Sequence, residues 1–123
     1  MVLLSYSLLD AIRSKLTHDD LRNKLKPYLE KSGYHQPEIV EEFLSRCFYQ
    51  RGKGYGDLES WGELGRKLSS IEDTFQEMKN NRLFYFAIPP NVFAETGIAI
   101  KKTSMADKGW SRMIVEKPFG KIL

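Results

Sequence analysis

The segment Leu83-Phe84-Tyr85-Phe86-Ala87-Ile88 decides the fold class of this sequence. It is a continuous apolar run that stops at Pro89 and Pro90, which lack the backbone N–H that a strand ladder uses. Continuous runs of this kind are typical of strands that are buried on both faces, as in a parallel sheet flanked by helices. We therefore predict a buried strand over residues 83–88.

A second strand is predicted over residues 112–115, directly before Glu116-Lys117-Pro118. A helix over about residues 91–102 and a loop through Asp107-Lys108-Gly109 separate the two strands. Because helices alternate with buried strands, the pattern predicts an α/β fold with a Rossmann-like parallel sheet and flanking helices.

Three helices are predicted upstream. Thr17 and Asp20 have the spacing of a capping box, so the first helix begins after Thr17, and Pro27 predicts a kink or an early end. The second helix opens at Pro37 and runs to about residue 46. Asp57 is expected to cap the third.

Apolar spacing indicates which side chains of these helices point inward, and a short strand is expected between them at residues 47–49. The inward positions are Ile39, Val40, Phe43 and Leu44 in the second helix, and Leu58, Trp61, Leu64, Leu68 and Ile71 in the third.

Composition narrows the class of protein. The 123 residues suffice for one small domain, and 41% apolar with 28% charged residues is typical of a soluble globular chain. The single Cys47 cannot form an internal disulfide, and no Cys/His cluster has zinc spacing, which favours the cytoplasm and predicts no metal site.

The net charge of +3 comes from scattered lysines, so nucleic-acid binding is not expected. No apolar run approaches the ~20 residues of a membrane span, so no membrane association is expected either.

Two turns at predicted strand ends are the candidate ligand sites. In an open parallel sheet, ligands gather beyond the carboxyl ends of the strands, which here lead into Pro89-Pro90 and Glu116-Lys117-Pro118. The Lys117 ammonium is a compact charge with three donors that suits a phosphate or a hydroxyl. From these residues alone, a merely solvated lysine is the alternative.

Two long motifs resemble one known family. Asn81-Arg82-Leu83-Phe84-Tyr85-Phe86-Ala87-Ile88-Pro89-Pro90-Asn91-Val92-Phe93 resembles NRLFYLALPPxVF/Y of the glucose-6-phosphate dehydrogenases. Gly109-Trp110-Ser111-Arg112-Met113-Ile114-Val115-Glu116-Lys117-Pro118-Phe119-Gly120 resembles that family's GWxRxIVEKPFG. The motifs keep the family's order and spacing, and the resemblance extends over residues 13–123.

The resemblance implies roles for five residues. Lys117 would contact both the sugar phosphate substrate and the nicotinamide cofactor, and Pro118 would be the family's cis-proline. Pro89 and Pro90 would lie beside the cofactor, and Phe93 would contact it. Many relatives have tyrosine at the Phe93 position, so a phenolic hydrogen bond would be lost while ring packing remains.

A third, shorter resemblance concerns the choice of cofactor. Arg13-Ser14-Lys15-Leu16-Thr17 is similar to the family's GYARS-x-LT, whose arginine recognises the 2′-phosphate that distinguishes NADP from NAD. A guanidinium fork matches a phosphate in two hydrogen bonds. The resemblance therefore implies NADP, while an exposed basic residue before a helix is the alternative for Arg13.

The sequence also departs from the family. No glycine-rich turn of the type GASGDLA precedes Arg13, and Asp10-Ala11-Ile12 stands where the family has Gly-Tyr-Ala. We therefore expect an atypical segment over residues 1–12 and a partial NAD(P)-binding domain over residues 13–123. The expected sheet is incomplete, since its first strand and the phosphate-binding loop are missing.

The implied function is NADP-dependent oxidation of glucose 6-phosphate to 6-phosphogluconolactone, in the pentose phosphate pathway, by an enzyme that is a homo-oligomer. The family's RIDHYLGK segment and histidine base have no counterpart here, and neither His18 nor His35 is placed to replace them. We therefore assign no catalytic residue and expect the isolated chain to be inactive. The alternatives are a non-catalytic interaction fragment, a gene-model artefact, or another sugar oxidoreductase with a Glu-Lys-Pro strand end.

Overall fold

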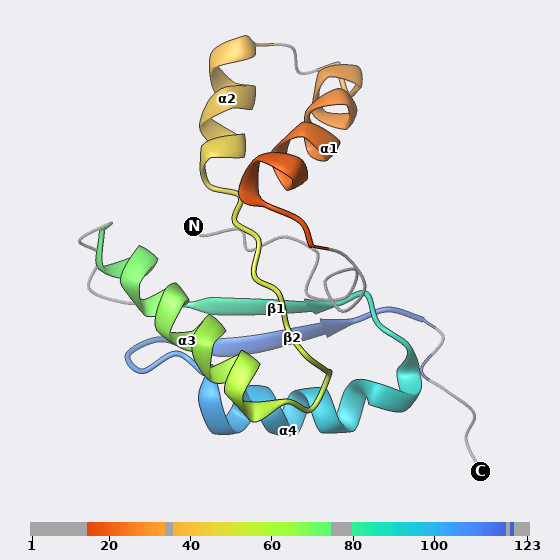
Figure 1. Ribbon diagram of the computed structural model, residues 1–123, viewed down its shortest axis with the longest axis vertical. Helices are drawn as coiled ribbons and strands as arrows, with labels where there is room; N and C mark the ends of the chain where they lie inside the picture. The colour runs from red at the N-terminus through yellow and green to blue at the C-terminus, as the bar shows by residue number, and fades with distance from the viewer. Residues whose placement is uncertain (1–14, 34–35, 75–79, 118, 120–123) are drawn as a thin grey trace. The chain divides into compact units, whose positions relative to one another are not determined.

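The computed structural model describes residues 15–33, 36–74, 80–117 and 119. The chain divides between residues 51 and 52 into two compact units, which are described separately. The elements, in chain order, are α1 (His18–Lys31), α2 (Pro37–Ser45), α3 (Leu58–Asp73), β1 (Arg82–Phe86), the short 3-10 helix η2 (Pro90–Val92), α4 (Phe93–Thr103) and β2 (Ser111–Val115) (Figure 1).

The N-terminal unit begins with the predicted capping box. The backbone N–H of Asp20 donates to Thr17 Oγ1 over 3.1 Å, and the N–H of Thr17 donates to Asp20 Oδ2 over 2.8 Å. The hydrogen bond from the Thr17 backbone is the main reason why the pKa of Asp20 is lowered. Helix α1 continues past Pro27 to Lys31, so the alternative of an early end is wrong. Pro27 and Asn23 are both exposed, and water can therefore bind the carbonyl that the proline leaves unpaired.

Helix α2 begins at Pro37 as predicted, and two of its expected inward side chains are buried. Val40 and Leu44 lie one above the other on the same face of the helix and are 7% and 4% exposed. Ile39 is 56% exposed, so the prediction that it points inward is wrong. Its position is about 100° around the helix from Val40.

Residues 47–49 do not form the predicted strand; within the described residues they pair with no other strand. Side chains of α1 instead form hydrogen bonds with the backbone of this extended segment. Arg22 Nε donates to the carbonyl of Cys47 over 3.1 Å, and the N–H of Tyr49 donates to His18 Nδ1 over 2.9 Å. His18 is thus half-buried and has a structural role.

Cys47 belongs to the core of this unit, together with Leu21 and Tyr49. It is 1% exposed, and burial raises the pKa of its thiol. We expect Cys47 in the native chain to react with Ellman's reagent about 100-fold more slowly than in denaturant, because reaction requires an opening of the structure that costs about 3 kcal/mol. Full reaction within the mixing time in native buffer would contradict this packing.

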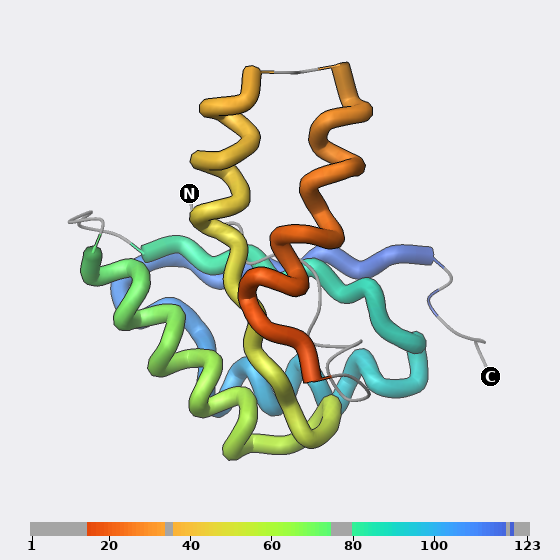
Figure 2. Tube along the Cα trace, turned by 45° about the horizontal axis from the view of Figure 1, so that its top comes forward, coloured from red at the N-terminus to blue at the C-terminus, as the bar shows by residue number. Residues whose placement is uncertain are grey.

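The C-terminal unit is a parallel strand pair with α3 and α4 on one side (Figures 1 and 2). Strands β1 and β2 pair in parallel, with Arg82 beside Ser111 at one end and Phe86 beside Val115 at the other. Both predicted strands are therefore present, although the first ends two residues early. The α/β fold class is confirmed, and the arrangement is consistent with part of a Rossmann-like domain.

Helix α3 is capped as predicted and packs against α4. The N–H of Ser60 donates to Asp57 Oδ2 over 2.9 Å, and the Ser60 hydroxyl is the main reason why the pKa of Asp57 is lowered. Of the side chains predicted to point inward, Trp61, Leu64 and Leu68 are buried, Ile71 is half-buried, and Leu58 is exposed. The prediction for Leu58 is wrong, since its side chain is 46% exposed although Ser60 and Trp61 in the same turn are buried.

One face of the strand pair is covered and the other is not. Arg82 and Phe86 are 7% and 5% exposed and point toward the helices, whereas Leu83 and Tyr85 are 51% and 38% exposed on the opposite face. The prediction that this strand is buried on both faces is therefore wrong for the described residues. Both helices of this unit cover the same face.

Candidate functional site

The two turns that the sequence singled out leave the same edge of the sheet. Because β1 and β2 are parallel and Phe86 lies beside Val115, the segments that follow these residues start side by side. One segment continues to Pro89-Pro90 and the other to Glu116-Lys117. The prediction that both turns lie beyond the carboxyl ends of neighbouring strands is thus confirmed, and this is where open α/β sheets bind their ligands.

The proline turn leads directly into α4. Pro89 precedes the 3-10 helix η2, and the N–H of Val92 donates to the Pro89 carbonyl over 3.1 Å. Phe93 is the first residue of α4, and its ring lies 5.9 Å from that of Phe86. The ring at position 93 therefore packs against the end of β1, and the turn offers an apolar wall.

Lys117 supplies the positive charge at this edge. Its side chain is exposed, and within the described part of the chain it forms no hydrogen bond or ion pair. An ammonium group without a protein partner has its donors available for a phosphate or a hydroxyl. Together with the proline turn and Phe93, this donor fits an anionic ligand that also has an apolar ring.

One contact at this edge was not predicted. The Tyr85 hydroxyl donates to Glu116 Oε1 and so links β1 to the residue before Lys117. Tyr85 lies beside Ile114, and its long side chain reaches two residues further along β2. The sequence alone could not predict this contact, because it depends on which residues of β1 and β2 lie side by side.

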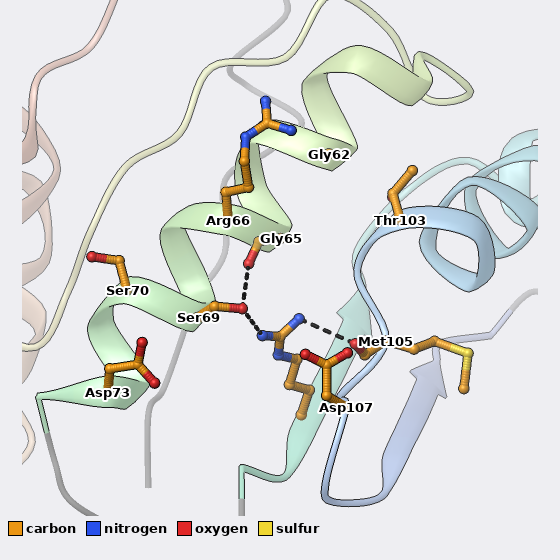
Figure 3. A pocket seen from close by; sticks show the side chains of 10 residues that line it. Gly62, Gly65, Arg66, Ser69, Ser70, Asp73, Thr103, Met105 and Asp107 are labelled. Carbon is orange, nitrogen blue, oxygen red and sulfur yellow. Dashed lines mark hydrogen bonds between the residues drawn. The ribbon is translucent and has the colours of Figure 1, made fainter.

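An open pocket of about 600 Å³ lies at the opposite, amino edge of the strands (Figure 3). Its lining residues are Gly62, Gly65, Arg66, Ser69, Ser70, Asp73, Arg82, Thr103, Met105 and Asp107. No residue that the sequence analysis assigned to a ligand belongs to this pocket.

The buried Arg82 beside that pocket has no donor left for a ligand. Its Nε and Nη2 donate to the two carboxylate oxygens of Glu72, both over 2.8 Å. Nη1 donates to the carbonyls of Ser104 and Met105, and Nη2 also donates to Ser69 Oγ. All five guanidinium N–H groups are occupied, so Arg82 has a structural role.

Comparison with known proteins identifies the family. The sequence model described as "Glucose-6-phosphate dehydrogenase, NAD binding domain" matches residues 4–123. The chain belongs to the glucose-6-phosphate dehydrogenase family. A family domain of this description binds a nicotinamide dinucleotide, which agrees with the donor and the apolar wall at the carboxyl edge. The match begins upstream of residue 13, and the predicted domain boundary there stays a prediction.

Individual relatives agree with the glucose-6-phosphate dehydrogenase assignment. The chain is 37% identical over 123 residues to glucose-6-phosphate 1-dehydrogenase 1, chloroplastic, of Arabidopsis thaliana, which covers 94% of this chain and 20% of that protein. It is 38% identical over 109 residues to the Drosophila simulans glucose-6-phosphate 1-dehydrogenase, covering 89% of this chain and 68% of that sequence. A solved structure of glucose-6-phosphate dehydrogenase in complex with its substrate glucose-6-phosphate matches with a TM-score of 0.76 and 39% identity, over 88% of this chain and 22% of that one. The chain thus spans about a fifth of the length of most of these relatives.

Two of the residues with expected family roles cannot be placed. Arg13 and Pro118 lie outside the described residues, so their roles stay predictions. In the part of the chain that is described, no helix is both long and apolar enough to cross a bilayer.

Proposed function

We propose that this chain forms part of the NADP-binding domain of an enzyme that oxidises glucose 6-phosphate to 6-phosphogluconolactone. The observation that carries the proposal is the position of Lys117 beside the proline turn, at the carboxyl edge of a parallel strand pair. The family assignment supports it, and one relative of known structure has glucose 6-phosphate bound. The family assignment also argues against a different sugar oxidoreductase.

In this proposal each described site residue has a physical task. The Lys117 ammonium holds the substrate and the cofactor near each other by donating hydrogen bonds to both. Pro89, Pro90 and Phe93 form the apolar wall that orients the cofactor and excludes water. Arg13, which lies outside the described residues, would pair with the 2′-phosphate and so make the site prefer NADP. Bound NADP supplies the chemistry of accepting a hydride from C1 of the sugar.

We further propose that the isolated chain binds the cofactor without turnover. Hydride transfer needs a base for the hydroxyl proton, and none of the described residues at the carboxyl edge is a histidine. His18 Nδ1 already accepts a hydrogen bond from the Tyr49 backbone. The complete enzyme would be a cytoplasmic homo-oligomer of the pentose phosphate pathway.

Titration of the purified chain with NADP tests the proposal. We expect Lys117→Met to weaken NADP binding by about 10- to 100-fold, because a hydrogen bond from a charged group contributes about 1.5–3 kcal/mol. Calorimetry or intrinsic tryptophan fluorescence measures the affinity, and NAD serves as the second titrant. NAD should bind more weakly, since it lacks the 2′-phosphate.

Lys108→Met is the matched control. Lys108 is also exposed, but it lies in the loop before β2, at the other edge of the strands. This variant should bind NADP like the unmodified chain. Equal affinities for NADP in all three proteins would remove Lys117 from the site, and no binding of either nucleotide at millimolar concentration would refute a dinucleotide site in this chain.

A second candidate function has one observation in its favour. The apolar sheet face that carries Leu83 and Tyr85 is exposed, which suits a non-catalytic interaction fragment. Cofactor titration separates this candidate from the first, because an interaction fragment needs no nucleotide.

A further inference from the structure

The hydrogen bond between Tyr85 and Glu116 lies directly beside the candidate ligand site. The Tyr85 hydroxyl donates to Glu116 Oε1, and Glu116 is the residue before Lys117. Pairing between the strands ends one residue earlier, at Val115. The hydrogen bond therefore joins β1 to the turn that carries Lys117, at a point that the strand ladder does not reach.

The side chains of β2 alternate between the two faces of the strand pair. Met113 lies on the face that the helices cover, because a Cβ at Gly97 of α4 would be only 3.9 Å from Met113 Sδ. Ile114 lies beside Tyr85 in the register, so it belongs to the opposite face. Glu116, two residues after Ile114, is on that opposite face as well, and there it accepts the hydrogen bond from Tyr85.

This alternation assigns Lys117 to the face that the helices cover. Consecutive residues of an extended segment point to opposite sides, so the residue after Glu116 points back toward the helices. The Phe93 ring and the proline turn are on that side and form the apolar wall of the site. Among the described contacts, the hydrogen bond from Tyr85 is the one that continues the alternation beyond the ladder.

We propose that Tyr85 is a positioning residue for Lys117: its hydroxyl holds Glu116 on one face and so directs the lysine ammonium to the cofactor on the other. This inference rests on the proposed function, because it takes Lys117 to be a ligand contact. Tyr85 acts through Glu116 and not through a contact of its own with the ligand. A lysine side chain has about 2 kcal/mol of rotamer entropy, and a turn that is fixed before the ligand arrives lowers the cost of ordering it.

NADP titration of four proteins tests the coupling between Tyr85 and Lys117. They are the unmodified chain, Tyr85→Phe, Lys117→Met and the double variant Y85F/K117M. Phenylalanine keeps the ring and removes only the hydroxyl. We expect Tyr85→Phe to weaken NADP binding by about 3- to 10-fold when Lys117 is present, but by less than about twofold in the Lys117→Met background. A residue that merely stabilises the unit would have the same effect in both backgrounds.

Two substitutions of Glu116 separate the hydrogen bond from the charge. Glu116→Gln keeps an oxygen that can accept from Tyr85, whereas Glu116→Ala does not. Both variants are neutral at this position, so the loss of the negative charge is common to them. We expect Glu116→Gln to bind NADP about 3- to 10-fold more tightly than Glu116→Ala. This difference should vanish when Tyr85→Phe is added to both.

NMR relaxation of the full chain provides a readout that needs no nucleotide. The backbone N–H of Lys117 should have an order parameter close to the ~0.85 of rigid backbone, and Tyr85→Phe should lower it toward ~0.6. The order parameter of Ile114, inside the ladder, should stay unchanged. Tyr28→Phe is the matched control, because Tyr28 is 76% exposed and its hydroxyl has no partner among the described residues. It should change neither the order parameter of Lys117 nor the affinity for NADP.

The outcomes distinguish this inference from the proposed function. If neither NADP nor NAD binds the unmodified chain, the proposed function fails, and the order parameters still decide whether Tyr85 holds the turn. An unchanged order parameter of Lys117 in Tyr85→Phe would overturn the inference. Equal losses of affinity in both Lys117 backgrounds, or equal affinities of Glu116→Gln and Glu116→Ala, would overturn it as well.

Discussion

Arg82→Ala is expected to lower the free energy of unfolding by about 3–5 kcal/mol, the cost of breaking a buried ion pair by removing one partner. Arg82 and Glu72 have side chains that are only 7% and 6% exposed. Without the guanidinium, the Glu72 carboxylate keeps its buried position but loses both hydrogen bonds. The carbonyl of Ser104 and the Ser69 hydroxyl also lose a donor. The total free energy of unfolding of a native protein is only about 5–15 kcal/mol, so the variant should be close to unfolding.

Denaturant unfolding followed by circular dichroism measures this effect. Lys53→Ala is the control: it removes an ion pair of the same unit, but one whose side chains are 71% and 65% exposed. We expect no measurable change in its unfolding midpoint. The double variant R82M/E72L removes both charges and should recover part of the loss. A midpoint for Arg82→Ala equal to that of Lys53→Ala would show that Arg82 does not hold the unit together.

Gly65→Ala should also destabilise the chain, by about 1–3 kcal/mol, although alanine is the better helix former. Gly65 lies inside α3, beside the C-terminal end of α4. A Cβ at this position would be 2.6 Å from the backbone oxygen of Thr103 and 3.4 Å from Cα of Ser104. The backbone there cannot move aside easily, since Ser104 is 0% exposed and its hydroxyl donates to the Trp61 carbonyl over 2.6 Å.

Gly62→Ala is the control for this prediction, because it should change the stability in the opposite direction. Gly62 lies in the same helix, and a Cβ there would meet only the end of the flexible Arg66 side chain, at 3.5 Å. Its substitution should stabilise the chain by about 0.5–1 kcal/mol, the usual gain for glycine to alanine in a helix. Thermal or denaturant unfolding compares the two variants. Stabilisation by both would mean that α3 and α4 are further apart than described.

The local parts of this structure could be predicted because short-range chemistry determines them. The caps at Thr17 and Asp57 depend on residues three positions away, and both were predicted correctly. The short strand at residues 47–49 was predicted wrongly, because its apolar composition suits a strand but side chains of α1 satisfy its backbone. Composition does not reveal such distant partners.

In the candidate site, too, general rules predicted some features, whereas contacts between distant residues were missed. The rule that parallel strands end at one edge correctly predicted that the Lys117 turn and the proline turn start together. The Tyr85–Glu116 hydrogen bond needed the register, which no local pattern supplies. The Arg82–Glu72 pair depends on the position of α3 on the sheet, which the sequence does not reveal, and the predicted strand began at Leu83, one residue after Arg82.

The parallel strand pair has a practical consequence for protein engineering. Residues that hold the C-terminal unit together, such as Arg82 and Gly65, gather toward one end of the strands, whereas Lys117 and the proline turn leave the other end. Libraries of variants in the two turns should therefore change ligand preference while thermal tolerance stays constant. Selection for heat resistance would act on the opposite end, so the two properties can be evolved in separate rounds and then combined.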